Sequence, residues 1–246
     1  MRKHAAAYIL SASLILCVVI WYAVYGAEAE RNLVIHFFDV GQGDGIFFEL
    51  PNHVQVLIDV LKRYDVGMVI ESGVSYATAD YDEWNRLLAQ KHVHVVYAHA
   101  GERVSLSERA VLDILHPFKD MVGARFANVH DSMVVTKLSY GSSTVLFMGD
   151  AEKIIEYRLM GSGIAIAADV LKIGYHGSKT SSTEEFLHAV NPRYAVISVG
   201  RKNRFGHPHQ EVIERIRKFG IKLFRTDEDG DVTFVSDGVL FSELRQ

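Results

Sequence analysis

Cysteine is nearly absent from this sequence, which removes two kinds of structure from consideration. The one cysteine among the 246 residues, Cys17, lies in an apolar N-terminal run. The rest of the chain therefore has no disulfide and no thiolate to offer a metal, so any metal ion would have to be held by His, Asp or Glu. A body free of cysteine also gives no indication of the redox compartment in which the protein works.

An excess of basic residues is missing too. The chain has 26 Lys and Arg against 30 Asp and Glu, a net charge of −4 and a pI of about 6.3. A nucleic-acid partner would therefore have to bind a local basic patch rather than the protein as a whole. Histidine, by contrast, is plentiful, and its twelve occurrences prompt the search for a metal site.

The length and the hydrophobic content predict one sizeable domain. A chain of 246 residues that is 49% hydrophobic can bury a substantial core. No repeat of fixed period and no interdomain linker follow the N-terminal run. We expect residues 1–30 to form a membrane anchor or signal segment and residues 31–246 to form a single domain.

The N-terminal run has the properties of a membrane segment. Arg2 and Lys3 precede residues 5–27, which carry no charge and are about long enough to span a bilayer as a helix. The basic start predicts that the N-terminus is cytoplasmic and that the body lies outside the cytoplasm. We favour an uncleaved anchor because of the length of the run. Cleavage near Ala29, which would release a secreted body, is the alternative.

After residue 30 the pattern changes to short strands joined by turns. Residues 33–40, 46–50 and 54–58 predict three strands, and residues 41–45 form a glycine-rich turn between the first two. Residues 60–64 then look helical, with no turn residue between them and the strand before.

The C-terminal half alternates strands with helices. Residues 144–148, 169–173 and 194–199 are predicted strands. Ser182 and Glu185 predict a capping box at the start of one helix, and Pro208 predicts the first turn of another.

Polar residues follow three of these strands. Asp150 and His176 come directly after strand ends, and His207 follows the next strand after a short loop. Strand ends are where layered α/β folds build their sites. His and Asp suit a divalent metal, and an Asp can bridge two ions. Three such residues at successive strand ends favour a site over separate capping or loop roles.

Four motifs in order resemble those of the metallo-β-lactamase domain of ComEC-type competence proteins. Residues 37–45, Phe-Phe-Asp-Val-Gly-Gln-Gly-Asp-Gly, are similar to the opening Asp-Val-Gly-Gln-Gly-Asp of that family. Residues 149–151 are similar to its Gly-Asp-Ala, residues 169–182 to its His-Gly-Ser segment, and residues 205–209 to its Gly-His-Pro segment. Order and spacing agree from about residue 32 to the end of the chain.

The resemblance implies an α/β (α+β) fold, the metallo-β-lactamase-like αββα sandwich, and descent from metal-dependent hydrolases. It implies zinc or manganese as the divalent metal and no nucleotide cofactor. It further implies single-stranded DNA or another phosphodiester as the partner, as in the uptake of DNA during competence.

The main ligand motif of the family, His-x-His-x-Asp-His, is absent. Its nearest imitation, His92-x-His94, has Val96 and Tyr97 where Asp and His are needed, so we interpret both histidines as structural.

The missing motif should follow the third strand. Residues 56–59 resemble the strand that precedes it in the family, and residues 60–66 resemble the helix that comes after it. We therefore expect a segment to be missing between Asp59 and Val60, and the N-terminal sheet to be incomplete.

The resemblance carries the family's site over only in part. At the position before His176, where the family usually has a second His, this chain has Tyr175. The implied metal ligands are His130, Asp150, His176 and, at the join, Asp59. The implied catalytic residues are Asp150 and His207. The implied substrate-binding residues are Asp44, Ser178 and Lys179.

Three hypotheses about function stay open. The chain is a weakened or mononuclear metal hydrolase, or a membrane-tethered non-catalytic remnant or binding module, or a truncated gene model of an active family member. We favour membership of the family with impaired activity, because one metal position has lost most of its ligands.

Overall fold

The structure is a computed structural model in which residues 32–52, 54–58, 66–126 and 128–244 are described. The predicted membrane segment, the predicted join and Asp59 therefore lie outside the described residues, and the predictions about them stay predictions. Within the described ranges, no helix is both long enough and apolar enough to cross a membrane.

An antiparallel sheet holds both ends of the described chain together. Its five strands lie in the order β14-β13-β1-β2-β3. The predicted meander forms three of them, and the last two strands of the chain add to the side of β1. The strands are β1 (Leu33–Phe38), β2 (Gly45–Glu49), β3 (Gln55–Ile58), β13 (Val232–Ser236) and β14 (Phe241–Leu244).

A larger mixed sheet of seven strands packs against the first, in the order β12-β11-β10-β9-β8-β7-β6. Strands β6 to β9 pair antiparallel, whereas β9 to β12 run parallel. The C-terminal ends of β9, β10 and β11 therefore meet at one edge. The strands are β6 (Arg103–Ser105), β7 (Ala110–His116), β8 (Val135–Tyr140), β9 (Ser143–Phe147), β10 (Val170–Lys172), β11 (Tyr194–Ile197) and β12 (Lys222–Arg225).

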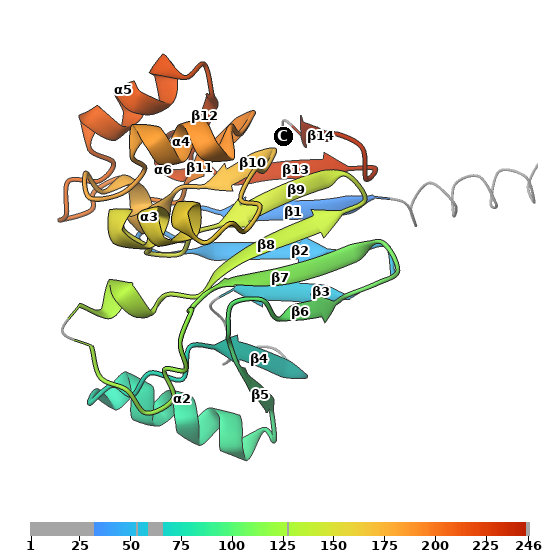
Figure 1. The fold of residues 1–246 in the computed structure, drawn as a ribbon, viewed down its shortest axis with the longest axis vertical. Coiled ribbons are helices and arrows are strands. Elements are labelled where there is room, and N and C mark those ends of the chain that lie inside the picture. The colour runs from blue at the N-terminus through green and yellow to red at the C-terminus, as the bar shows by residue number, and fades with distance from the viewer. Residues whose placement is uncertain (1–31, 53, 59–65, 127, 245–246) are drawn as a thin grey trace, which may run out of the picture.

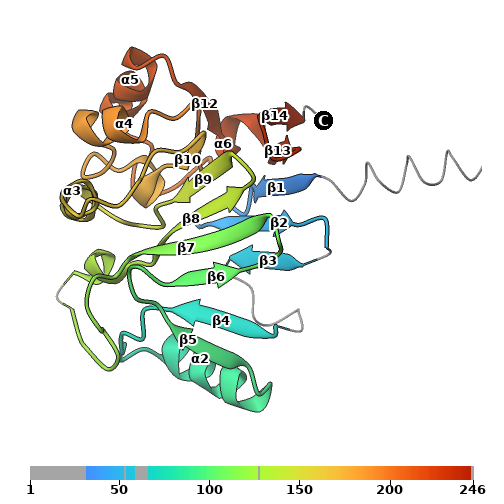
Figure 2. The same cartoon turned by 45° about the vertical axis from the view of Figure 1, so that its right-hand side comes forward.

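Helices cover the outer face of the seven-stranded sheet, on the side away from β1 and β2 (Figures 1 and 2). They are α3 (Lys153–Gly161), α4 (Glu184–Val190), α5 (Gln210–Lys218) and the short α6 (Thr226–Asp229). Two single-turn 3₁₀ helices, η1 (Val129–Ser132) and η2 (Gly174–Gly177), lie in loops.

The alternation along β9 shows how the layers are joined. Phe147 faces the first sheet, with its ring centre 6.1 Å from that of Phe48 and 6.4 Å from that of Phe37. Its neighbour Leu146 points the other way and packs in the core that contains Ile155 of α3. A strand buried on both faces is apolar throughout, and each such side chain contributes about 1.5–3 kcal/mol on burial. The predicted α/β metallo-β-lactamase-like arrangement is found in these layers.

A smaller unit lies at one end of the molecule (Figure 2). It consists of β4 (Met68–Glu71), α2 (Ala79–Gln90) and β5 (His94–Tyr97), and the two strands pair parallel with each other. Trp84 of α2 donates its Nε1–H to Glu71 Oε2 at 2.8 Å, which fastens the helix to β4. In the described chain, β4 pairs with β5 and not with β3. The predicted loss of a segment between Asp59 and Val60, and with it the incomplete N-terminal sheet, falls outside the described residues and stays a prediction.

Two predicted helix starts are wrong. The cap of α4 is Thr183, whose Oγ1 accepts from the N–H of Phe186, and not Ser182. Ser182 is unsuited to the role because its backbone is left-handed, with φ 56°, and its N–H is bound by Glu156. The helix expected from Pro208 begins two residues later, at Gln210, with His209 as its cap.

Candidate functional site

The loops that follow β9, β10 and β11 bring three residues of the candidate site together. Asp150 follows β9, His176 lies in η2 after β10, and Ser198 follows β11. Tyr175 and His176 both adopt left-handed backbone conformations, with φ of 48° and 52°. Such conformations are uncommon for residues with a Cβ, and they often mark functional sites.

His176 is held by two contacts. Its Nδ1 lies 2.8 Å from the backbone oxygen of Ser198, and its Nε2 lies 3.2 Å from Oδ1 of Asp150. Because a carbonyl oxygen can only accept, Nδ1 carries a proton, and the ring is fixed with Nε2 toward the carboxylate. This is the orientation in which a ligating histidine is usually held.

The two charges of this pair shift each other's pKa. Burial opposes the protonation of His176, but the hydrogen bond and charge of Asp150, helped by Asp44, outweigh it and raise the pKa of His176. Burial likewise opposes the ionisation of Asp150, yet His176, with Lys172 and His130, lowers the pKa of Asp150. Each partner therefore shifts the pKa of the other toward its charged form.

A buried ion pair supports the same site from the other sheet. Lys172 is 0% exposed, and its Nζ lies 2.8 Å from Oδ2 of Asp44 and donates to the backbone oxygen of Ile173 at 3.0 Å. Oδ1 of Asp44 lies 3.7 Å from Nδ1 of His176. Asp44, predicted to bind substrate, thus engages a lysine and stands behind the histidine.

Gly200 lets the glycine-rich turn that carries Asp44 come this close. A Cβ at Gly200 would meet the backbone nitrogen of Gln42 at 3.0 Å and the carbonyl carbon of Gly41 at 3.1 Å. A larger residue would push the turn, and Asp44 with it, away from the second sheet.

His130 and His207 complete the neighbourhood. Nδ1 of His130, on η1, lies 3.9 Å from Oδ2 of Asp150. The ring of Tyr175 lies between the two histidines, 4.0 Å from His130 and 5.5 Å from His207 between ring centres. Burial, His209 and His176 lower the pKa of His207. The structure therefore brings His130, Asp150 and His176 together, with His207 beside them across Tyr175.

The remaining predicted residues lie differently. Ser178 is 5% exposed and its Oγ lies 3.0 Å from Oγ1 of Thr180, so its side chain faces a protein neighbour. Lys179 is exposed. Asp59 lies outside the described residues, and its role stays a prediction.

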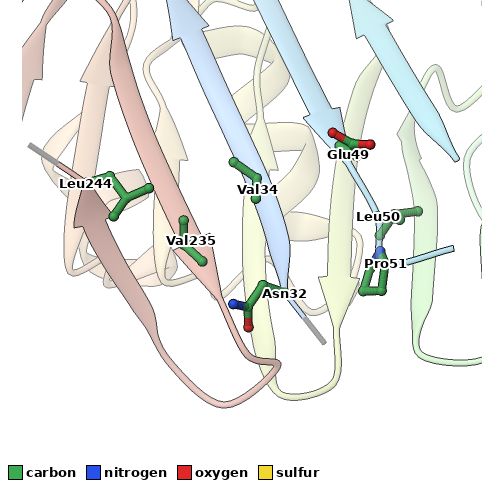
Figure 3. A pocket seen from close by; sticks show the side chains of 7 residues that line it. All are labelled: Asn32, Val34, Glu49, Leu50, Pro51, Val235 and Leu244. Atoms are coloured by element: carbon green, nitrogen blue, oxygen red, sulfur yellow. The ribbon is translucent and has the colours of Figure 1, made fainter. Parts of the chain in front are cut away.

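An open pocket on the first sheet contains none of these residues (Figure 3). It lies at the end of β1 opposite the glycine-rich turn. Its lining is mostly apolar: Asn32, Val34, Glu49, Leu50, Pro51, Val235 and Leu244.

The residues present fit the implied divalent metal only in part. Nε2 of His176 and the carboxylate of Asp150 are suitable donors, and Nδ1 of His130 is buried with no hydrogen-bond partner in the described structure. However, the described ranges contain no group of three or more His, Cys, Asp or Glu side chains arranged to hold a metal ion. Two donors and a third nearby are part of a site and not a complete one.

Sequence reasoning gave no role to Lys172 or to the carbonyl of Ser198. A signal for Lys172 was available, because it is the one charge in the apolar run from Val170 to Ile173. A lysine in a buried strand needs a partner of opposite charge. The Ser198 carbonyl gives no such signal, since every residue has one.

Comparison with known proteins supports the resemblance that the sequence motifs indicate. Residues 129–201 match the family model of the Metallo-beta-lactamase superfamily. The chain is 39% identical over 108 residues to ComE operon protein 3 of Bacillus subtilis (strain 168), covering 44% of this chain and 14% of that protein. It is 43% identical over 101 residues to Competence protein ComA of Neisseria gonorrhoeae, covering 41% of this chain and 15% of that protein. The chain thus matches only a small part of each of these longer proteins.

Among solved structures, a mutant of CmlA beta-hydroxylase superposes with a TM-score of 0.53. The match covers 82% of this chain and 53% of that one, at 12% sequence identity. At so low an identity the likeness concerns the fold alone.

Proposed function

This chain resembles the ComEC-type competence proteins through a metallo-β-lactamase-superfamily segment, and on that premise we propose that it is a metal-dependent hydrolase of phosphodiesters or nucleic acid with a weakened metal centre. The observation that carries the proposal is the pair of His176 and Asp150. Nδ1 of His176 is bound by Ser198 O at 2.8 Å, and Nε2 faces Asp150 Oδ1 at 3.2 Å.

The roles of the side chains follow from this geometry. Asp150 and His176 would hold a divalent ion, with His130 as the third donor. A bound ion would supply Lewis-acid activation at a phosphoryl oxygen. His207 would accept a proton, and burial, His209 and His176 lower its pKa and so favour the neutral ring that this role needs. Asp44, paired with Lys172, places a negative charge 3.7 Å from Nδ1 of His176.

A second candidate function is a non-catalytic binding module. Two observations favour it. The ligand set in the described ranges is incomplete. Tyr175 stands where the family usually has a second His, and its ring, which cannot replace that ligand, lies 4.0 Å from the ring of His130. Catalytic zinc sites hold three protein ligands and an open position for water. A site with fewer ligands would bind its metal more weakly and turn over slowly or not at all.

We further propose that residues 5–27 anchor the protein in a membrane with the body outside the cytoplasm. The length and lack of charge of that run support the proposal. Protease added to intact spheroplasts should digest the body. A body that stays protected, or that fractionates without membranes, would contradict the proposal, and release of the body into the medium would indicate cleavage near Ala29.

The hydrolase proposal is tested with the full-length chain in mild detergent. Bound zinc and manganese are measured per chain, and cleavage of single-stranded DNA is followed with manganese added. We expect weak metal binding that Asp150→Ala and His176→Ala abolish together with any cleavage. His188→Ala, on the exposed side of α4, is the control. Two tightly bound ions per chain would contradict the weakened centre, and cleavage unchanged by Asp150→Ala would refute the proposed site.

A further inference from the structure

A row of rings in contact with one another runs from the candidate site to the loop that follows β11. Tyr175 lies against His130 and His207, with ring centres 4.0 Å and 5.5 Å apart. His207 stacks in turn on Phe205, with 5.9 Å between ring centres and 25° between ring planes. These four rings, here called the ring row, begin beside Asp150 and end at an exposed side chain.

The outer end of the ring row is open and basic. Phe205 is 51% exposed, and Cζ of Arg204 lies 5.0 Å from the centre of its ring. Residues 201–205 read Arg-Lys-Asn-Arg-Phe, with three basic residues and no acidic one. Lys202 and Arg204 are both exposed. On a chain with a net charge of −4, this loop is a local basic patch of the kind that a nucleic-acid partner needs.

The loop is fixed by the part-buried side-chain amide of Asn203. Nδ2 of Asn203 donates to the backbone oxygens of Gly200 at 2.9 Å and His207 at 2.7 Å. Its Oδ1 accepts from the N–H groups of Phe205 at 3.2 Å and His207 at 3.0 Å. The backbone that carries Phe205 is thereby held in one shape before any ligand binds, which lowers the entropic cost of binding.

We propose that the ring row and the basic loop form a binding track for single-stranded nucleic acid. Bases stack on Phe205 and on the planar guanidinium of Arg204, while phosphates contact Arg204 and Lys202. The track rests on the proposed function in one respect, since it leads a phosphodiester backbone toward Asp150.

The pattern of rings and charges favours single strands over duplex. Aromatic and arginine planes alternating with basic side chains suit bases whose faces are open. A duplex keeps its bases stacked and paired, so it offers the track only its phosphates. A single strand therefore gains both contributions and a duplex gains one.

Binding is measured by fluorescence anisotropy on the full-length chain in mild detergent, with EDTA present so that no metal contributes. The probes are labelled oligothymidylate, an abasic oligomer of the same length, and a duplex. The variants are Phe205→Ala, Phe205→Tyr and Arg204→Gln. Two matched controls are Tyr97→Ala, whose side chain is 49% exposed on β5, and Arg217→Gln in the exposed last turn of α5.

Each variant has its own expected signature. Phe205→Ala should weaken oligothymidylate binding about five-fold or more, leave the abasic oligomer unchanged, and leave the salt dependence as it was. Arg204→Gln should weaken binding of both oligomers and lower the slope of log affinity against log salt by about 0.7, the value of one single-strand phosphate contact. Phe205→Tyr and the two controls should bind as the parent does.

The proposal is overturned if Phe205→Ala behaves like Tyr97→Ala, or weakens both oligomers equally, or if the duplex binds as tightly as the single strand. Because the assay contains no metal, it is independent of hydrolysis. Binding with the expected signatures but no cleavage would refute the proposed hydrolase alone. Cleavage without those signatures would refute the track alone.

Discussion

The ion pair between Lys172 and Asp44 should be the most costly polar contact of the site to break. Asp44→Asn keeps the shape of the side chain and an acceptor oxygen but removes the charge that faces the lysine. Lys172 is 0% exposed, and its ammonium would keep only neutral acceptors, including the backbone oxygen of Ile173 at 3.0 Å. Leaving a buried charge without its counter-charge costs about 3–5 kcal/mol.

The reverse substitution should cost less. In Lys172→Met the buried charge is gone and the volume is nearly kept, while Asp44 retains a side chain that is 15% exposed and lies 3.7 Å from His176. We expect a loss of about 1–3 kcal/mol, smaller than that of Asp44→Asn, because the carboxylate left behind is partly exposed while its Oδ1 is buried without a hydrogen-bond partner in the described structure. The double variant Asp44→Asn/Lys172→Met should be no worse than Lys172→Met alone, since it buries no unpaired charge.

Urea and thermal unfolding of the four proteins, at neutral pH with EDTA, give the double-mutant cycle. The expected coupling is about 3–5 kcal/mol, because the double variant should lose no more than Lys172→Met alone, and Asp44→Asn should lower Tm by about 6–20 °C for a domain of this size. If the two single effects instead add within about 0.5 kcal/mol, the two charges do not support each other. The inference that Asp44 compensates the buried charge of Lys172 would then be refuted.

Three further perturbations test other parts of the fold. Glu156→Gln should lower the free energy of unfolding in urea by about 1–3 kcal/mol. The two oxygens of the buried carboxylate accept from the N–H groups of Ser182 and Thr183, and an amide NH₂ in place of one oxygen cannot accept. An unchanged midpoint would contradict this. Burial, outweighing a hydrogen bond to Met133, lowers the pKa of His116. The contribution of neutral His116 to the free energy of unfolding should therefore be present above about pH 6.5 and lost as the pH falls. A His116→Asn variant that loses stability as steeply as the parent between pH 7 and 5 would refute this. Gly177→Ala should destabilise by about 1–3 kcal/mol, because φ is +78° and a Cβ would meet Cβ of Pro208 at 2.6 Å, whereas Gly161→Ala, with open space around it, should be neutral; equal effects would contradict the steric argument.

Much of the fold could be predicted because its signals are local. The alternation of apolar residues in β1 and β2 and the turn between them are set by neighbours in sequence, and the strands appear where expected. The convergence of Asp150 and His176 followed from a general property of parallel strands, whose C-terminal ends meet at one edge.

The contacts that could not be predicted from the sequence join segments that lie far apart along the chain. Ser182 and Glu185 have the spacing of a capping box, but Glu156 of α3 binds the N–H of Ser182, and Thr183 caps the helix instead. A local rule cannot anticipate an acceptor from another helix. The same holds for Lys172, whose partner Asp44 comes from the other sheet.

The contact between the rings of Tyr175 and His130 could not be predicted for the same reason. Tyr175 was recognisable as a departure from the family pattern, but where its ring lies depends on a left-handed backbone, with φ of 48°. The ring of His130 is brought to it by η1, a single turn some forty residues earlier in the chain. Loop conformations of this kind carry little signal in the sequence.

The division of the site between the two sheets has a consequence for how such a protein changes over generations. Three site residues follow strands of the second sheet that are buried on both faces: Asp150, His176 and Ser198. The first sheet contributes Asp44. Substitutions in the loops of the first sheet can therefore weaken the site without unfolding the second sheet, which carries the other site residues. A substitution can therefore change the site without changing whether the chain folds.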